Sequence, residues 1–243
     1  MSSLDNIRSV LLDIEGTTTP IAFVHDVLFS YARAHVRDFL TENFNSQEVG
    51  ADIVLLREEH AVDVSENRDP PPLAGESGIE SIAAYVEWLI ARDRKSTGLK
   101  SLQGKIWQQG YLKGALKSQV FADVRTALER WHARGINISI FSSGSVLAQQ
   151  LLFAHTEAGD LTRFIDNYFD TKVGKKGEAK SYGQVAAALD LPPNEIIFIS
   201  DVVAELEAAN ESGMRTLLCI RPGNPPQEAA ERFTAIHSFD EYK

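Results

Sequence analysis

The sequence is poor in cysteine and in long apolar runs. Its single cysteine, Cys219, rules out an internal disulfide framework and fits a reducing compartment. The apolar residues around it, 217–220, indicate a buried strand thiol rather than a nucleophile. No apolar run approaches the roughly 20 residues that a membrane-spanning helix needs, and the N-terminus shows no signal-peptide pattern. We therefore expect a soluble, cytoplasmic protein with no membrane partner.

Positive charge is also in the minority. The 24 Lys and Arg residues face 34 Asp and Glu residues, which gives a formal net charge of −10. This balance argues against a nucleic-acid backbone as the partner. No Gly-rich Walker loop is present, so the sequence does not indicate nucleotide-driven chemistry. A phosphorylated small molecule stays possible as a substrate, because a cation and a few local donors are enough to neutralise it.

The chain of 243 residues is longer than an average domain, and its character changes along its length. Residues 21–111 show helical periodicity broken by polar connections, and no strand pattern. From about residue 120, strand-like and helix-like stretches alternate, as in α/β folds. We predict a Rossmann-like parallel-sheet core made of residues 1–20 and 112–243, with residues 21–111 inserted after the first strand as an all-helical domain.

Short apolar runs predict the strands of the core, and amphipathic stretches predict its helices. The expected strands are residues 10–12, 136–141, 164–170, 196–200 and 216–220. The expected helices are residues 123–134, 145–155, 178–189 and 205–212, with loop, a short helix and little else after residue 223. Within the inserted domain the last helical stretch is expected at residues 103–116.

Polar side chains follow three of the predicted strands, and a lysine lies in the loop before the fourth strand. In open α/β sheets ligands bind beyond the carboxyl ends of the strands. Each residue alone has an ordinary explanation, such as a helix cap or a solvated side chain. Together, at one edge of one sheet, they indicate a reaction site. They are Asp13 and Glu15 after the first strand, Ser142 and Ser143 after the second, Lys176 in the loop, and Asp201 after the fourth strand.

The chemistry that fits this set is phosphoryl transfer through a covalent aspartyl-phosphate. A carboxylate and a phosphate dianion repel each other, so a divalent cation is needed, and Mg²⁺ prefers carboxylate, phosphate and water oxygens. We predict Asp13 as the nucleophile and, with Asp201, as a metal ligand. The two serines and the N-terminus of the following helix would take the phosphate oxygens, and Lys176 would neutralise charge. Glu15 would protonate the leaving oxygen and then activate water.

In their order and spacing these residues resemble the four motifs of the haloacid-dehalogenase-like hydrolases. The helical insertion resembles the cap domain of that superfamily, so the resemblance covers nearly the whole chain. The chain departs from the usual motif by carrying Glu15 at the second acidic position. With residues 16–20, 103–111 and 141–145, this departure resembles more narrowly the enolase-phosphatase (acireductone synthase) family of methionine salvage.

The resemblance implies a two-step reaction on 2,3-diketo-5-methylthiopentyl-1-phosphate, in which enolisation precedes dephosphorylation to the acireductone, with a single Mg²⁺ ion. In the superfamily the residue at the position of Glu15 gives the metal its backbone carbonyl, which leaves the side chain for other work. We hypothesise that this carboxylate is the base in enolisation. By position, the resemblance implies a metal site of Asp13, Glu15 and Asp201 and substrate binding by Ser142, Ser143 and Lys176.

Several alternatives stay open. A phosphatase of the same superfamily that acts on another small phosphomonoester would use the same residues. A dehalogenase needs no metal, and a receiver-like signalling domain would be much shorter and lack the insertion. A binding module is possible only if Asp13 is not nucleophilic. We expect a monomer, because no long exposed apolar stripe stands out.

Three further residues have two interpretations each. Glu205, one helical turn after Asp201, either supports the metal site or lies on the surface of a helix. Trp107 and Tyr111 either cover the methylthio group of the substrate or pack inside the helical domain. The six histidines show no spacing typical of a metal site, and we expect structural or surface roles for them.

Overall fold

The computed structural model describes residues 6–73, 78–94 and 96–242, and the chain divides into two compact units. One unit comprises the chain up to Val24 together with the chain from Lys117 onward, and the other comprises His25–Leu116. The boundaries predicted after residues 20 and 111 differ from these by a few residues. Among the described residues no helix is long and apolar enough to cross a membrane.

The first unit contains a sheet of six parallel strands in the order β3-β2-β1-β4-β5-β6. The chain adds β2 and β3 on one side of β1 and then continues with β4 on the other side. Ligands of open α/β sheets bind at such a reversal of strand order, which lies here between β1 and β4. The strands are β1 (Ser9–Leu12), β2 (Asn137–Phe141), β3 (Asn167–Phe169), β4 (Ile196–Ser200), β5 (Arg215–Cys219) and β6 (Ala235–Ile236).

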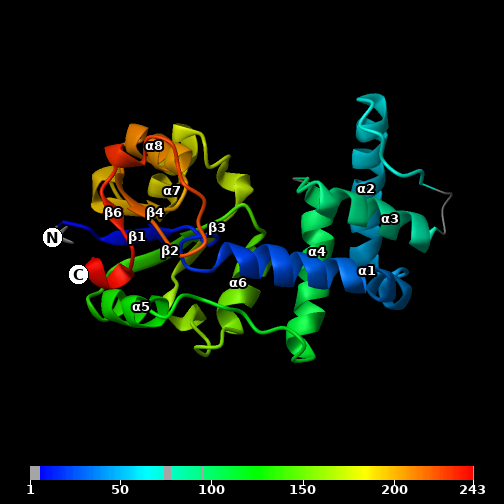
Figure 1. Ribbon diagram of the computed structural model, residues 1–243, viewed down its shortest axis with the longest axis horizontal. Helices are drawn as coiled ribbons and strands as arrows, with labels where there is room; N and C mark the ends of the chain where they lie inside the picture. The colour runs from blue at the N-terminus through cyan, green and yellow to red at the C-terminus, as the bar shows by residue number, and fades with distance from the viewer. Residues whose placement is uncertain (1–5, 74–77, 95, 243) are drawn as a thin grey trace. The chain divides into compact units, whose positions relative to one another are not determined.

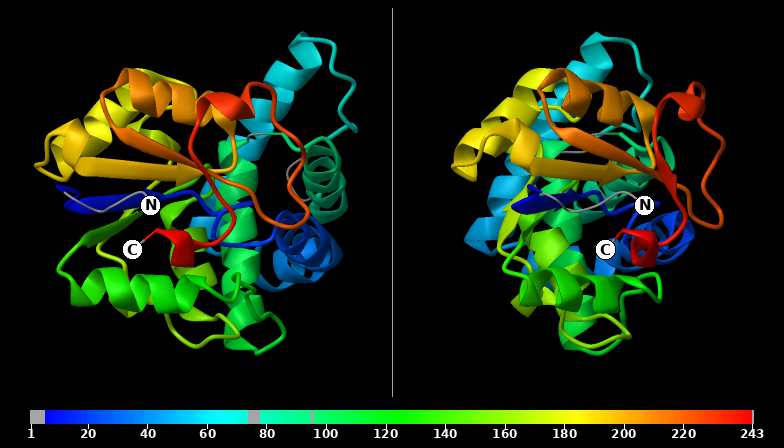
Figure 2. Two further views of the ribbon diagram at one scale, coloured as in Figure 1. Left: turned by 60° about the vertical axis from the view of Figure 1, so that its left-hand side comes forward. Right: turned by 90° about the vertical axis from the view of Figure 1, so that its left-hand side faces the viewer.

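Helices cover both faces of this sheet (Figures 1 and 2). Val10 and Leu12 pack in the cluster formed with α5 (Val124–Ala133) and α6 (Val146–Ala154), whereas Leu11 packs with α7 and α8. Successive side chains of a strand point to opposite faces, so a strand covered on both faces needs a continuous apolar run. This is why β1 and β4 are readable from the sequence, and the predicted α/β class is confirmed. The second pair of helices is α7 (Ala179–Ala188) and α8 (Val203–Glu211).

Two strand predictions need correction. The strand expected at 164–170 is only Asn167–Phe169, because Thr162–Phe164 forms a 3-10 turn. The tail was expected to contain no strand, but Ala235–Ile236 pairs with β5 at the sheet edge. A strand of two residues is too short for its alternation to show in the sequence. Further short helical turns are Phe23–Phe29 (a π-helix), Thr171–Val173, Pro193–Glu195, Ala230–Arg232 and Phe239–Glu241.

Helices are the only regular elements among the described residues of the second unit. Its helices are α1 (Ser30–Asn43), α2 (Gln47–Ser65), α3 (Ile79–Ala91) and α4 (Thr97–Leu112). The last helix begins six residues before the predicted start at 103, because Ser96 Oγ accepts the N–H of Leu99 (2.9 Å) and Glu59 accepts the N–H of Thr97 (2.7 Å). These bonds satisfy backbone donors that the first helical turn leaves open.

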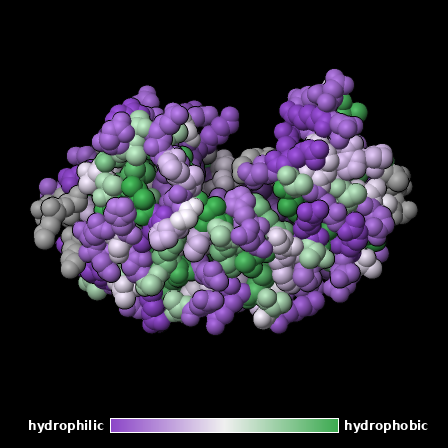
Figure 3. Space-filling model, in the orientation of Figure 1, coloured by the Kyte–Doolittle hydropathy of each residue, from purple (hydrophilic) through white to green (hydrophobic). Residues whose placement is uncertain are grey.

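Aromatic side chains fill the interior of the helical unit. Trp107 is 8% exposed, and its Nε1 donates to the carbonyl of Leu28 (2.8 Å). Tyr111 is 5% exposed. Both residues therefore pack inside the unit, which favours the packing interpretation. On the face of the molecule drawn in Figure 3, hydrophilic residues predominate and apolar residues occur in small groups.

Candidate active site

Asp13 and Asp201 lie on the two sides of the strand-order reversal. Asp13 follows β1 directly, and its N–H donates to the carbonyl of Ile199 in β4 (3.0 Å). Asp201 follows β4 directly, and β1 and β4 pair in parallel. Asp13 is 5% exposed and Asp201 is 6% exposed. The fold thus places two buried carboxyl groups at one edge of the sheet.

Lys176 reaches Asp13 from the loop before α7. Its Nζ lies 2.6 Å from Asp13 Oδ1 and 2.6 Å from Glu205 Oε2. Ser200 Oγ lies 2.9 Å from Glu205 Oε2 and 3.5 Å from Asp13 Oδ2. One ammonium group therefore contacts two carboxylates, and Asp201 adds a third carboxylate beside them.

Burial and repulsion between the carboxylates change how these groups ionise. Burial, with the charges of Asp13 and Glu205, raises the pKa of Asp201 to about 7. Burial and the charge of Asp13 also raise the pKa of Glu205, although Lys176 opposes this. Burial lowers the pKa of Lys176, but Asp13 and Glu205 outweigh it and hold that pKa above its ordinary value. The site carries an excess of negative charge that a divalent cation would neutralise.

The donor set fits Mg²⁺. The carboxylates of Asp13 and Asp201 are hard oxygen ligands of the kind this ion prefers. The main chain at Gly16 lies against the Asp201 carboxylate, because a Cβ atom on Gly16 would overlap Asp201 Oδ2. The described part of the chain holds no cluster of three or more His, Cys, Asp or Glu side chains suited to a metal.

A tight turn follows Asp13 and contains Glu15. The N–H groups of residues 17–19 lie 3.3, 3.0 and 2.9 Å from the carbonyl of Ile14. Gly16 has a φ of 68°, a left-handed conformation that glycine adopts without a steric penalty. Glu15 is half-buried and forms an isolated β-bridge with Thr19. The turn passes beside the carboxyl end of β4, because Gly16 lies against the Asp201 carboxylate.

Two side chains from the loop after β5 hold this turn. Arg221, 5% exposed, donates from Nε to the carbonyl of Thr17 (3.1 Å) and from Nη1 to Asp123 Oδ1 (3.0 Å). Asn224 Nδ2 donates to the carbonyl of Gly16 (2.9 Å). Neither residue was predicted from the sequence, because a polar residue after a strand does not show which distant loop it will contact.

Ser142 and Ser143 follow β2, whose parallel pairing with β1 places them at the same sheet edge as Asp13. Ser142 Oγ accepts the N–H of Gly144 (3.2 Å). The N-cap of α6 is Ser145, which accepts a backbone N–H of the helix (3.3 Å). The ordinary explanation of a helix cap therefore applies to Ser145 and to neither of the two predicted ligands.

Glu205 belongs to the site, and its interpretation as a surface carboxylate is wrong. Its side chain is 17% exposed and contacts Lys176 and Ser200. Tyr182, which was not predicted from the sequence, donates from its hydroxyl to the carbonyl of Lys176 (2.8 Å), and its ring packs against Phe141 and Phe198. The only sequence signal for Glu205 was its spacing from Asp201, and the helix pattern gave no signal for Tyr182.

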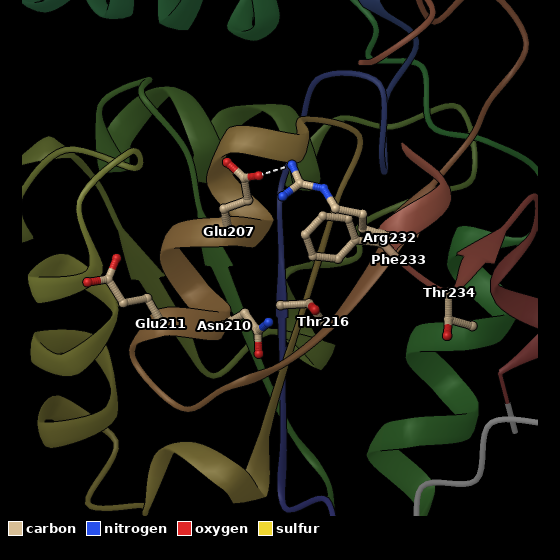
Figure 4. Close-up of a pocket in the computed structure, with 7 residues that line it drawn as sticks. All are labelled: Glu207, Asn210, Glu211, Thr216, Arg232, Phe233 and Thr234. Carbon is tan, nitrogen blue, oxygen red and sulfur yellow. Dashed lines mark hydrogen bonds and ion pairs between the residues drawn. The ribbon is translucent and has the colours of Figure 1, made fainter. Parts of the chain in front are cut away.

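A separate depression of about 580 Å³ lies beside α8 and β5 (Figure 4). Arg232 forms an ion pair with Glu207 across it. None of the predicted site residues lines this depression, so it is no part of the candidate site. Its lining residues are Glu207, Asn210, Glu211, Thr216, Arg232, Phe233 and Thr234.

Cys219 has the environment that the sequence predicts. The residue is 1% exposed in β5, and burial raises the pKa of its thiol to about 12. A thiol that stays protonated and enclosed is a poor nucleophile. The interpretation as a buried strand thiol is confirmed.

Comparison with known proteins connects this geometry to a family. The family model of the haloacid dehalogenase-like hydrolases matches residues 7–213. The chain belongs to this family. Among solved structures, the UTR4 protein of Saccharomyces cerevisiae is similar with a TM-score of 0.78 and 32% identity, over 96% of this chain and 99% of that one. CbbY from Rhodobacter sphaeroides, solved in complex with phosphate, shares the fold at a TM-score of 0.58 and 17% identity, over 97% and 96% of the two chains.

Curated relatives show which members of the family this chain resembles. Enolase-phosphatase E1 of Synechococcus elongatus is 55% identical over 236 residues, which cover 97% of this chain and 98% of the relative. A Sorghum bicolor protein is named a probable bifunctional methylthioribulose-1-phosphate dehydratase/enolase-phosphatase E1. It is 47% identical over 244 residues, 98% of this chain and 47% of that longer protein. The resemblance to enolase-phosphatases stated from the motifs is confirmed.

Proposed function

We propose that this family member is an enolase-phosphatase of methionine salvage, a phosphoric monoester hydrolase that also enolises its substrate. The observation that carries the phosphatase part is the buried contact between Asp13 and Lys176 at the strand-order reversal, beside Asp201. The near full-length likeness to enolase-phosphatase E1 supports the enolase part.

The name of the fused plant relative supports a particular substrate class. Its other activity is the dehydration of methylthioribulose-1-phosphate. Loss of water from that sugar phosphate gives a 2,3-diketone that keeps the methylthio group and the phosphate. We propose this compound, 2,3-diketo-5-methylthiopentyl-1-phosphate, as the substrate. The products are 1,2-dihydroxy-3-keto-5-methylthiopentene and inorganic phosphate.

In the proposed phosphoryl transfer, an Asp13 carboxylate oxygen attacks phosphorus and the bond from phosphorus to the enol oxygen breaks. Water then hydrolyses the aspartyl-phosphate and restores the carboxylate. Lys176 lies where it offsets the charge of the transferred group, and Ser142 and Ser143 hold its oxygens. Glu15 gives a proton to the leaving oxygen and later accepts one from water.

The proposed cofactor is Mg²⁺, held by the carboxylates of Asp13 and Asp201 and by the main-chain carbonyl of Glu15. When bound, the ion supplies positive charge that reduces repulsion between carboxylate and phosphate and acidifies a C–H beside a carbonyl. The side chain of Glu15 is then available to remove that proton at the start of enolisation.

Stopped-flow absorbance and phosphate release, recorded together on the diketone phosphate, test the proposal. We expect an enol absorbance that rises before phosphate appears and needs Mg²⁺. Phosphate release from generic monoesters without an enol signal would overturn the enolase part and leave a phosphatase of another small phosphomonoester. Absence of both signals would overturn the whole proposal.

The variant Glu15→Asp separates the two half-reactions. The shorter side chain withdraws the carboxylate from the C–H but keeps the acid that most of the superfamily has at this position. We expect enolisation to slow at least tenfold, whereas phosphate release from a generic monoester changes by less than threefold. Normal enolisation in this variant would refute the role of Glu15 as the base.

We also propose that residues 25–116 act as a cap and that the protein works as a cytoplasmic monomer. The all-helical content of this unit supports the first point. Light scattering coupled to size-exclusion chromatography measures the oligomeric state directly, and a mass near twice 26.9 kDa would contradict the monomer.

A further inference from the structure

Gln149 occupies an enclosed position in α6. The residue is 1% exposed, whereas its neighbour Gln150 is exposed. Its Nε2 lies 2.9 Å from the carbonyl oxygen of Gly144 and 2.8 Å from that of Phe169. An amide nitrogen carries two hydrogens, so both are used, one for the loop after β2 and the other for the end of β3.

These two bonds complete a ring of hydrogen bonds around Ser142. The carbonyl of Phe169 also accepts the N–H of Ser142 (3.1 Å). At the other end, Ser142 Oγ accepts the N–H of Gly144 (3.2 Å). Gln149 thus joins Phe169, Ser142 and Gly144 in one closed network, which fixes the loop at both of its ends.

This ring of hydrogen bonds determines which donor or acceptor of the Ser142 hydroxyl remains for a ligand. A hydroxyl has one hydrogen to donate and two lone pairs with which to accept. Because Ser142 Oγ already accepts from Gly144, its own hydrogen is left to be donated. Donation from O–H is what an anionic phosphate oxygen requires.

Packing alone does not account for an amide at this position. Gln149 Oε1 is buried and has no hydrogen-bond partner among the described residues. A buried acceptor without a partner lowers stability, so the amide is retained here for its two donated bonds to the serine loop and to the end of β3.

We infer that Gln149 is a positioning residue, which holds the Ser142–Gly144 loop in the form that binds the phosphate of the substrate. The inference rests on the proposed role of Ser142 in phosphate binding. Gln149 does not touch the substrate and acts through Ser142.

The test measures binding of inorganic phosphate to the whole 243-residue chain with Mg²⁺ by isothermal titration calorimetry. The variant Gln149→Met keeps the length of the side chain and removes both donors. We expect it to weaken phosphate binding at least tenfold, while its circular dichroism spectrum stays unchanged. The matched control is Gln150→Met on the exposed side of the same helix, which should change the affinity less than twofold.

A double-mutant cycle shows whether Gln149 acts through Ser142. Ser142→Ala alone should weaken phosphate binding, and adding Gln149→Met to it should weaken binding less than twofold further. A full tenfold loss in the Ser142→Ala background would overturn the inference, because Gln149 would then act by another route. Wild-type affinity in Gln149→Met would overturn it as well.

A measurement on the wild-type protein covers the case in which Gln149→Met does not fold. In ¹H–¹⁵N spectra the side-chain amide of Gln149 should exchange slowly with solvent and shift on phosphate titration, whereas that of Gln150 should do neither. Fast exchange or an unmoved signal for Gln149 would overturn the inference. Inorganic phosphate is the probe, so a failure of the proposed enolase activity would leave these results interpretable.

Discussion

At the scale of single residues, position 16 requires glycine for two reasons, its backbone conformation and its close neighbours. Its φ of 68° is left-handed, and a Cβ would overlap Asp201 Oδ2 and come within 3.0 Å of Asn224 Oδ1. Both neighbours are polar groups that hold the site together, so neither can move away without disturbing it. A side chain here should therefore affect activity more than stability.

We expect Gly16→Ala to lower kcat/KM at least a hundredfold, because the new methyl group displaces the Asp201 carboxylate. The left-handed backbone itself costs about 1–2 kcal/mol for an alanine. Steady-state kinetics and urea unfolding measure the two effects separately. Gly135→Ala is the matched control, since Gly135 has a φ of 71° with nothing within 4 Å of its Cβ position. This control should lose similar backbone stability and keep its activity, and equal activities of the two variants would contradict the prediction.

At the scale of elements, a buried carboxylate joins α2 to α3 in the helical unit. Asp63, 2% exposed, accepts from the Tyr85 hydroxyl (2.8 Å) and from the guanidinium groups of Arg68 (2.7 Å) and Arg94 (2.8 Å). Burial raises the pKa of Asp63, but the bonds from Arg68 and Tyr85 and the charge of Arg94 outweigh it, and the pKa lies below 3.8. The ionised form is therefore stabilised by folding.

This network predicts a dependence of stability on pH. A carboxyl group whose pKa falls on folding contributes stability above its unfolded pKa, near 3.8, and loses it as the pH drops through the folded value. At pH 7 we expect Asp63→Asn to lower the free energy of unfolding by about 1–3 kcal/mol. Urea unfolding should show this difference shrinking below about pH 4. Asp38→Asn, at an exposed position of α1, is the control. A pH-independent difference for Asp63→Asn would refute the assignment.

The elements also show where prediction from sequence stops. Strands β1 and β4 were predictable, because burial on both faces leaves a continuous apolar run. The start of α4 at Thr97 was not, because it depends on Glu59, which reaches its N–H from another helix. Strand β6 exists only because Ile236 meets Cys219 at the sheet edge.

At the scale of the whole molecule, three of the 34 acidic side chains meet at the carboxyl edge of the sheet. Asp13 and Glu205 contact Lys176 and Asp201 lies beside them, so the protein without a metal holds repelling carboxylates. A ligand that binds the folded state alone adds stability through mass action. Mg²⁺ should thus affect folding as well as activity, and only in the unit that contains Asp13.

We expect a chelator to abolish phosphate release and Mg²⁺ to restore it. At a hundredfold excess of Mg²⁺ over its Kd, binding adds about 2.7 kcal/mol. This corresponds to a rise in Tm of about 5–10 °C for a unit of this size. Differential scanning calorimetry with and without Mg²⁺ measures the shift. Asp201→Asn should remove it, and an unchanged shift in that variant would contradict the proposed ligand.

The sequence by itself determined the α/β class, most strand positions and which polar residues follow the carboxyl ends of the strands, because backbone periodicity and burial act locally. Only the tertiary structure decided which side chains meet. Lys176 and Asp13 are 163 residues apart in the chain, and their contact depends on strand order. Arg221 at the turn after Asp13, and Gln149 under the serine loop, likewise depend on helix and loop packing. Those long-range contacts follow from strand order and from the packing of helices and loops, which no local sequence pattern encodes.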